Sequence, residues 1–259
     1  MAKIIAVCNQ KGGVGKTTTT INLSSFLAYY GRKTLIVDFD PQANATSGLG
    51  LDYNKLPRTI YQNLLFNIHP KETIIQTPIF GLDLFPASPH LIGAQVELAN
   101  FENKELRLKQ LLDIIKDEYH YILIDLPPSL GLLTINGLVA ADYVLIPIQT
   151  EFFALDGLYQ LINTIDLIRR NLDEDLKILG TVLTLYDRRN RLDRLVLKNI
   201  MRNFPGYVFN TVIPRNISLA EAPSFGQSIL QYAPNSEGGR AYRRLAEEVI
   251  NLLEAQNKN

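Results

Sequence analysis

Short, continuously apolar segments alternate along the chain with longer segments in which apolar residues recur every three or four positions. Runs such as Ile122-Leu123-Ile124 and Val144-Leu145-Ile146 are apolar at consecutive positions, which is typical of strands buried on both faces of a sheet. We predict strands over residues 3–8, 34–38, 82–86, 121–125, 143–148, 178–185 and 207–213.

The longer segments show the period of amphipathic helices. In the segment 16–30, one apolar face is formed at positions i, i+3, i+4 and i+7 by Leu23, Phe26, Leu27 and Tyr30. We predict further helices near residues 103–118, 131–140, 155–170, 191–203 and 237–255. Because strands and helices alternate throughout, the pattern predicts an α/β fold with a mostly parallel central sheet and helices on both faces. The irregular stretch 50–80, with its three prolines Pro57, Pro70 and Pro78, is interpreted as an insertion rather than a second domain.

Composition narrows the class of protein. The chain has 259 residues, 46% hydrophobic and 20% charged, which suits one folded domain rather than a disordered chain. Lysine plus arginine (26) equals aspartate plus glutamate (26), which excludes a uniformly basic protein but leaves room for a local basic patch. The single cysteine, Cys8, excludes an internal disulfide and a four-cysteine metal site within one chain, and we interpret it as a core residue. No apolar run approaches the roughly 20 residues of a spanning helix, and the start does not resemble a signal peptide, so we expect a soluble cytoplasmic protein.

A glycine-rich stretch, Gln10-Lys11-Gly12-Gly13-Val14-Gly15-Lys16-Thr17-Thr18, lies between the first predicted strand and the first predicted helix. Glycines allow successive backbone N–H groups to point inward at an anion, and the helix adds its positive amino end. Lys16 then supplies a charge for β- and γ-phosphates, the Thr17 hydroxyl suits Mg²⁺, and Thr18 suits a phosphate oxygen. The sequence therefore predicts a phosphate-binding loop.

This loop departs from the ordinary phosphate-loop pattern in one way. Gln10 stands where that pattern has a glycine, and a second lysine, Lys11, opens the loop beside Gly12 and Gly13. An extra cation here suits a phosphate, either in its own subunit or in a neighbour.

Three acids follow predicted strands. Asp125 ends the apolar strand 121–125, where a carboxylate beside a phosphate loop is placed to hold a Mg²⁺ shell. Asp38 and Asp40 flank Phe39 at the end of the second strand, on one side of it if the strand continues. A carboxylate at this place suits the orientation of an attacking water.

The segment Lys-Gly-Gly-Val-Gly-Lys-Thr-Thr resembles the deviant Walker A loop of the ParA/MinD group of P-loop ATPases. Further matching segments follow in order at residues 38–44, 124–129 and 212–216, so the resemblance extends from residue 4 to about residue 245. The chain is similar in particular to chromosomal ParA proteins of the Soj type. The resemblance implies a P-loop NTPase domain over residues 1–259, a three-layer sandwich with no N-terminal DNA-binding extension.

The resemblance also implies roles for site residues. Asp125 is expected to act as the Walker B residue through a metal-bound water, and Asp40 as the switch I aspartate that orients the attacking water. Asp38 is expected to support the loop or the metal shell. Lys11 is expected to reach the nucleotide of the other subunit, which implies a homodimer closed over two ATP molecules. The expected catalytic residues are Lys11, Lys16 and Asp40; the expected nucleotide ligands are Lys11, Gly12, Gly13, Val14, Gly15, Lys16, Thr17 and Thr18 at the phosphates and Pro214, Arg215 and Asn216 at the adenine; the expected Mg²⁺ residues are Thr17 and Asp125.

Six cations share a short window and are opposed by only Asp187 and Asp193. They are Arg188, Arg189, Arg191, Arg194, Lys198 and Arg202. The last four lie on one face of a predicted helix, while Leu192, Leu195, Val196 and Ile200 are expected to pack inward. The resemblance implies non-specific binding of double-stranded DNA through these residues and Arg215. Since a dimer carries two patches, DNA binding is expected to depend on ATP.

The expected function is that of a partition ATPase, which hydrolyses ATP to ADP and phosphate on the nucleoid and is stimulated by a ParB-type partner. Two alternatives stay open: a related ATPase that positions a protein cargo, and a MinD-like membrane regulator. The second alternative requires a basic amphipathic tail, whereas residues 245–254 are acidic, so no membrane partner is expected. A metal-cluster carrier would need cysteines after the Walker B segment, which the sequence lacks. Phe225 and Gln227 stand where relatives often carry His and Lys, which removes support for DNA contacts from that loop.

Overall fold

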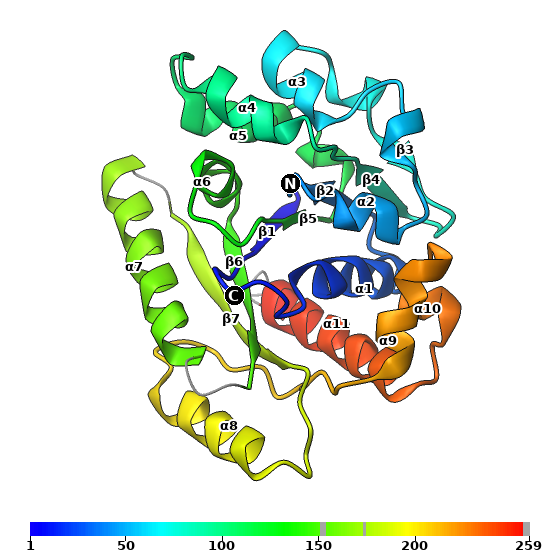
Figure 1. Ribbon diagram of the computed structural model, residues 1–259, viewed down its shortest axis with the longest axis vertical. Coiled ribbons are helices and arrows are strands. Elements are labelled where there is room, and N and C mark those ends of the chain that lie inside the picture. Colours follow the sequence, from blue (N-terminus) through cyan, green and yellow to red (C-terminus); the bar gives the residue numbers. More distant parts are fainter. Residues whose placement is uncertain (151–153, 173–174, 256–259) are drawn as a thin grey trace.

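The computed structural model describes residues 1–150, 154–172 and 175–255. Within these residues seven strands form one sheet in the order β3-β4-β2-β5-β1-β6-β7 (Figure 1). The strands are β1 (Lys3–Val7), β2 (Thr34–Asp38), β3 (Ile75–Gln76), β4 (Leu82–Phe85), β5 (Tyr121–Asp125), β6 (Tyr143–Gln149) and β7 (Lys177–Thr184). All neighbouring pairs are parallel except β3 with β4, so the predicted mostly parallel sheet is confirmed.

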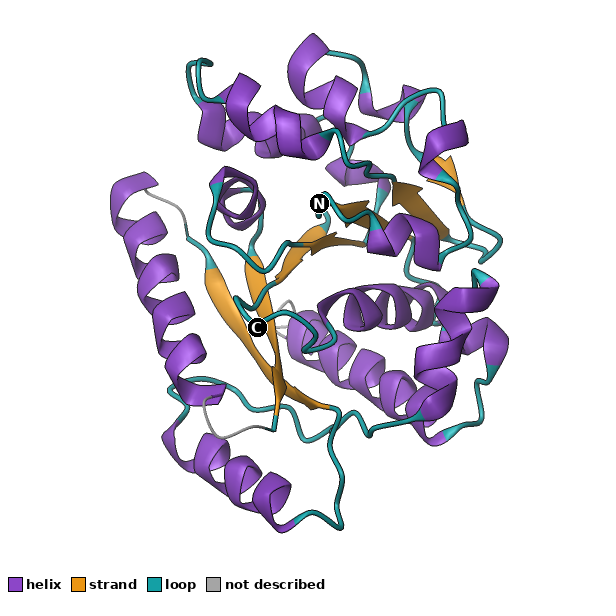
Figure 2. Ribbon diagram, viewed as in Figure 1, coloured by secondary structure: helices purple, strands orange, loops and turns teal. Residues whose placement is uncertain are grey.

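Helices cover both faces of this sheet (Figure 2). They are α1 (Lys16–Tyr29), α2 (Asn44–Gly48), α3 (Ile60–Phe66), α4 (Leu91–Leu98), α5 (Arg107–Asp113), α6 (Leu132–Val139), α7 (Ala154–Leu172), α8 (Arg191–Asn203), α9 (Ile217–Glu221), α10 (Ile229–Tyr232) and α11 (Glu237–Ala255). Single 3₁₀ turns lie at Tyr53–Lys55, Pro70–Glu72, Lys104–Leu106, Lys116–Glu118 and Ala222–Phe225.

The side-chain alternation of the strands divides the core into layers. On β1, Ile5 and Val7 pack with α1 and α11, whereas Ile4 and Ala6 pack in the cluster that contains residues of α3 to α7. Both sets are buried, which explains why the central strands are apolar at consecutive positions. The three-layer sandwich expected from the sequence is therefore confirmed, and α11 packs against α1 and the sheet as expected (Figure 1).

One predicted strand, 207–213, is wrong. Phe209 N donates to Thr181 O at 2.9 Å and Ile213 N donates to Leu183 O at 2.8 Å. The bonded residues are four apart on one segment but only two apart on β7, so the intervening chain bulges outward and no ladder forms. Its N–H groups at Asn210 and Thr211 donate instead to the Glu248 carboxylate of α11.

The predicted helix over 103–118 is interrupted rather than continuous. Its middle is α5, and separate 3₁₀ turns precede and follow it. The Asn136 side chain of α6 occupies the first junction, where Nδ2 donates to Lys104 O at 2.8 Å and Oδ1 accepts from Leu108 N at 3.2 Å. The pattern did not predict β3 or the short helices α2, α3, α4, α9 and α10. Within the stretch 50–80, β3 joins the central sheet by pairing with β4.

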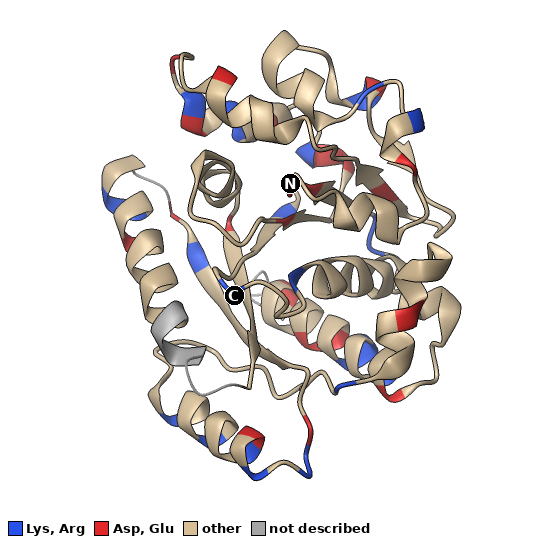
Figure 3. Cartoon of the chain, viewed as in Figure 1, with Lys and Arg blue, Asp and Glu red and all other residues tan. Residues whose placement is uncertain are grey.

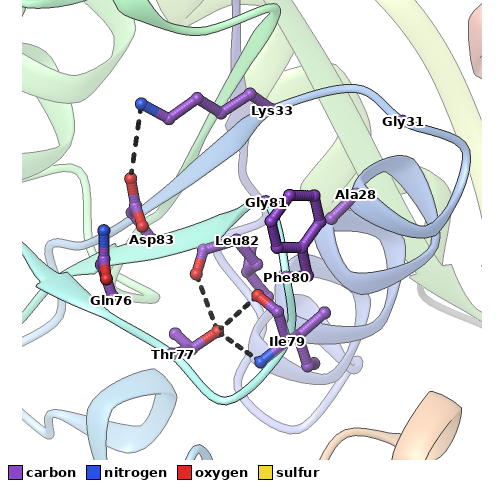
Figure 4. A pocket seen from close by; sticks show the side chains of 10 residues that line it. All are labelled: Ala28, Gly31, Lys33, Gln76, Thr77, Ile79, Phe80, Gly81, Leu82 and Asp83. Carbon is purple, nitrogen blue, oxygen red and sulfur yellow. Dashed lines mark hydrogen bonds and ion pairs between the residues drawn. The ribbon is translucent and has the colours of Figure 1, made fainter.

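A hollow of about 340 Å³ lies beside the turn between β3 and β4, at the amino ends of β2 and β4 (Figure 4). Its polar rim includes Lys33 and Asp83, whose charged atoms are 3.9 Å apart, and Asp83 also accepts a hydrogen bond from the Tyr119 hydroxyl at 2.9 Å. Phe80 is fully exposed beside it. In parallel sheets, ligand sites gather at the carboxyl ends of the strands, so the nucleotide site is sought at the opposite edge.

Candidate active site

The glycine-rich loop connects the end of β1 to the first residue of α1. Gly13 (φ 76°) and Gly15 (φ 85°) adopt the left-handed conformation that favours glycine, and Gly15 caps α1. The loop is also bonded to the end of β7, the edge strand of the sheet, where the Thr184 hydroxyl donates to Val14 O at 2.7 Å. Loop backbone and the amino end of α1 therefore converge on one place, as an anion site requires.

Lys16 is folded back into this loop. Its Nζ donates to Lys11 O at 3.1 Å, and the residue is only 7% exposed. Burial lowers its pKa, an effect opposed by the negative charges of Asp125 and Asp40. The ammonium group of Lys16 therefore lies inside the loop, near the Lys11 carbonyl and the carboxylates of Asp125 and Asp40, where it can bind a phosphate.

Asp125 lies at the end of β5, beside the start of α1, and is fully buried. Its carboxylate accepts hydrogen bonds from Thr17 Oγ1 at 2.7 Å and from Thr20 Oγ1 at 3.3 Å. Burial raises the pKa of Asp125, and the nearby charge of Asp38 raises it further. A hydroxyl and a carboxylate in contact next to a phosphate loop are oxygen ligands of the kind that suit Mg²⁺. This ion usually completes its coordination with waters and with phosphate oxygens of a substrate. These residues therefore fit the expected metal.

Asp38 is a second buried carboxylate, directly opposite Asp125 in the pairing of β2 with β5. Its Oδ2 accepts from Thr46 N at 2.8 Å and from Thr46 Oγ1 at 2.7 Å, and Thr46 Oγ1 in turn accepts from Ala87 N at 3.0 Å. Burial raises the pKa of Asp38, opposed by the hydrogen bonds from Thr46. Asp38 thus anchors α2 and the chain after β4 to the end of β2.

Asp40 lies in the turn that leads from β2 to α2. Because β2 ends at Asp38, strand alternation no longer sets its direction. Its Oδ1 accepts from Gln42 N at 2.9 Å, and the residue is 7% exposed. The structure therefore separates the two acids: Asp38 is held inside by Thr46, and Asp40 stands in the loop.

Replacing Thr46 by valine is expected to weaken this anchor. Asp38 loses one charge-assisted hydrogen bond and Ala87 N loses its acceptor, so we expect the free energy of unfolding to fall by about 1–3 kcal/mol. We also expect ATP turnover to fall, since the loop with Asp40 is less firmly held. Urea unfolding and phosphate release measure the two effects. Thr46→Ser, which keeps the hydroxyl, is the control, and a Thr46→Val protein as stable as wild type would remove this role.

The loop expected at the adenine follows the bulged segment. Pro214 forms an isolated bridge with Tyr186, and Arg215 N donates to Tyr186 O at 3.1 Å. The side chain of Asn216 caps α9, where its Oδ1 accepts from Leu219 N at 3.2 Å. Pro214 and Arg215 thus line a hollow at the end of β7, while the Oδ1 of Asn216 serves the helix.

The basic residues gather along α8 and on the loop that leads into it (Figure 3). All six are exposed. The Arg189 guanidinium donates two hydrogen bonds to Asp187, and Arg194 Nη1 donates to Arg188 O at 2.7 Å. The expected inward packing holds for Ile200 but is wrong for Leu192 and Leu195, which are 42% and 54% exposed. The reason is that α8 lies beyond the end of β7 and reaches the core through few residues, such as Ile200 and Phe204 (Figure 1).

Sequence reasoning missed three hydroxyl residues of the site: Thr20, Thr46 and Thr184. Thr20 had a signal, because it lies one helical turn after the Walker lysine. Thr46 and Thr184 had none, because Thr46 meets Asp38 across an irregular turn and Ala87 41 positions away, and Thr184 meets Val14 170 positions away.

Cys8 is buried, and burial raises its pKa to about 12, so it is a core residue. In residues 1–150, 154–172 and 175–255, no cluster of three or more His, Cys, Asp and Glu side chains is arranged to hold a metal ion. The same part of the chain contains no helix with the length and apolar character that crossing a membrane requires.

Comparison with known proteins identifies the family of the chain. A family model described as an AAA domain matches residues 2–178, more than half of the chain. The chain is 49% identical to sporulation initiation inhibitor protein Soj of Bacillus subtilis over 96% of this chain and 98% of that protein. It is 48% identical to chromosome partitioning protein ParA of Myxococcus xanthus over 96% of this chain and 88% of that protein.

A solved structure of cobyrinic acid a,c-diamide synthase from Mycobacterium smegmatis, with bound ADP and magnesium, superposes with a TM-score of 0.88 at 36% identity. The match covers 99% of this chain and 97% of that one, so the fold is shared with a protein whose structure holds ADP and magnesium. The chain is a P-loop ATPase and belongs to the Soj/ParA family of chromosome-partitioning proteins.

Proposed function

We propose that this protein partitions a chromosome or plasmid through an ATP-dependent dimer that binds DNA. The observation that carries the proposal is a cluster of side chains at the carboxyl ends of the strands. Lys16 lies inside the glycine-rich loop, and Thr17 and Asp125 contact each other beside it. Lys16 binds the phosphates, and Thr17 and Asp125 hold Mg²⁺, which supplies charge that offsets the triphosphate when bound. Asp40 orients the attacking water.

Dimerisation is proposed from the outer surface of the same loop. Lys11, Gly12 and Gly13 are exposed, and a Cβ at either glycine would meet no atom of its own chain within 4 Å. The backbone there is open to close approach by a second copy, with Lys11 reaching its nucleotide as a clamp on developing charge. Hydrolysis then releases the pair.

DNA binding is proposed through exposed arginines at the end of β7 and on α8. Such cations suit phosphate contacts without base reading. One protomer offers few contacts, whereas two patches held in one dimer act together. A ParB-type protein is proposed to stimulate hydrolysis. The dimer then stays on the nucleoid until hydrolysis releases it.

The test is DNA affinity measured with ATP, with ADP and without nucleotide, across salt concentrations. We expect tight, salt-sensitive binding of random-sequence duplex only with ATP and magnesium. Equal affinity in all three nucleotide states would contradict the proposal, as would a protein that remains monomeric with a non-hydrolysable ATP analogue.

Reversing the charge of Arg189 tests the DNA surface directly. In the wild-type protein Arg189 pairs with Asp187 through atoms 2.9 Å apart, so in Arg189→Glu two carboxylates face each other. Since one positive charge becomes negative in each protomer, we expect DNA affinity with ATP to fall at least about tenfold at low salt. ATP-driven dimerisation is expected to stay intact. Electrophoretic mobility shift measures the first and size-exclusion chromatography the second, with Arg170→Glu on α7 as the matched charge control; unchanged DNA affinity would exclude this residue from the surface.

A further inference from the structure

A hollow of about 580 Å³ opens beside the end of β7. Five arginines line it, contributed by three segments that are far apart in the sequence. They are Arg188 and Arg189 from the loop before α8, Arg215 from the loop before α9, and Arg240 and Arg244 from the first turns of α11. The two α11 arginines belong to none of the groups that the sequence pattern singled out.

The charge balance of the hollow favours an anion. The acids that line it are Asp187 and Glu237, so five cations face two carboxylates and leave a formal excess of three positive charges. Asp187 is already engaged: its Oδ1 accepts from Arg189 Nε at 3.0 Å and its Oδ2 from Arg189 Nη2 at 2.9 Å. Most of the remaining guanidinium charge is therefore available to an incoming anion.

The hollow is held in shape by the backbone. Tyr186 N donates to Ile213 O at 3.1 Å and Arg215 N donates to Tyr186 O at 3.1 Å, which joins the two loops. On α11, Arg240 and Arg244 are one turn apart on the exposed face, while Ala241 and Leu245 beside them are buried in the core. Rigid helical placement lowers the entropic cost of ordering these side chains on a ligand.

Arginine at such a place suits phosphate in particular. The planar guanidinium donates two parallel hydrogen bonds to one phosphate, and several of them around a hollow match consecutive phosphates of a strand. By contrast, the exposed face of α8 carries Leu195 and Met201 among its cations, exposed by 54% and 60%. That face offers phosphate less uniform charge than the hollow does.

We propose that the arginine rim of this hollow is the centre of the DNA-binding surface, where Arg240 and Arg244 of α11 bind the phosphate backbone together with Arg188, Arg189 and Arg215, while Pro214 is left to the expected adenine site. The inference rests on the proposed function, because it assigns where a DNA-binding dimer makes its contacts. It places α11, which packs on α1 and the sheet, in direct contact with the nucleic acid.

The test is the double variant Arg240→Gln/Arg244→Gln in the full chain, with random-sequence duplex and a non-hydrolysable ATP analogue. We expect DNA affinity to fall about tenfold for each arginine lost from a protomer, the scale of one charge-assisted hydrogen bond. A dimer loses four cations, so the slope of log affinity against log salt is expected to shrink by roughly 3 to 4. The control is Arg170→Gln, an exposed arginine in the last turn of α7, which leads to the start of β7, whereas the hollow lies at the end of β7. It removes one positive charge from each protomer, half the number that the double variant removes.

Two further measurements accompany this test. Arg240→Lys/Arg244→Lys keeps the charge and is expected to keep the salt slope, while thermal unfolding shows whether each variant is folded. Unchanged DNA affinity in the double glutamine variant, in a wild-type background that binds DNA, overturns this inference and leaves the proposed function standing. A loss of ATP affinity instead of DNA affinity also overturns it, because Arg240 and Arg244 would then serve the nucleotide. A wild-type protein that binds no DNA in any nucleotide state refutes the proposed function and this inference with it.

Discussion

Lys16→Ala is expected to abolish detectable ATP binding. The Lys16 ammonium is buried, contacts the Lys11 carbonyl at 3.1 Å and lies among the buried carboxylates of the site. Without it, the triphosphate would enter a site in which the three carboxylates Asp125, Asp38 and Asp40 remain and the buried cation of the loop is missing. Removing one partner of a buried charge pair costs about 3–5 kcal/mol, which corresponds to an affinity loss of roughly 10²–10³-fold or more.

The measurement is the rise in unfolding temperature on addition of Mg²⁺ and ATP, since a ligand that binds only the folded state stabilises it in proportion to its affinity. Wild type is expected to gain several degrees and Lys16→Ala none. Lys33→Ala, a lysine at the other edge of the sheet, is the matched control and is expected to respond as wild type does. A Lys16→Ala protein that still binds ATP tightly would show that the glycine loop is not the phosphate site.

Asp40→Ala is expected to give a protein that binds ATP, forms a dimer and does not turn over. Asp40 stands in the loop rather than in the Asp38 anchor, so its loss leaves the contacts of Thr46 and Asp125 in place. A positioned carboxylate that orients or deprotonates the attacking water contributes about 10²–10⁴-fold to the rate. We expect phosphate release to fall by that factor while nucleotide affinity is unchanged.

Size-exclusion chromatography with ATP and magnesium detects the trapped dimer, and the same sample with ADP gives the monomer reference. Gln42→Ala serves as the control, because the bond that Asp40 accepts comes from the backbone of Gln42 and survives the substitution. Normal turnover in Asp40→Ala would move the water-positioning role to another group, and a monomer with ATP would count against the trapped state.

Interactions between the segment after Asp40 and the segment after Asn216 illustrate a limit of the sequence. Gly50 (φ 83°) and Gly226 (φ 64°) lie back to back, and a Cβ built on Gly226 would come within 2.6 Å of the Gly50 Cα. Each glycine is needed because of the other, yet 176 positions separate them in the numbering of the chain. Neither was marked by its local pattern.

The sequence by itself determined the features that depend on neighbours along the chain. The strands 34–38 and 121–125 and the helices 191–203 and 237–255 have the predicted bounds, because apolar periodicity is a local property. The phosphate loop was equally readable, since one strand, one turn and one helix build it.

Only the tertiary structure decided how distant segments complete one another. The order β2-β5-β1-β6-β7 brings Asp38 beside Asp125 and carries Thr184 to the Val14 carbonyl. It also decides that Leu195 faces solvent and that Arg240 and Arg244 share a hollow with Arg189. The physical reason is that strand order and packing, which depend on how the whole core is buried, decide which side chains meet across a sheet. A local pattern fixes only which face of its own element a residue occupies.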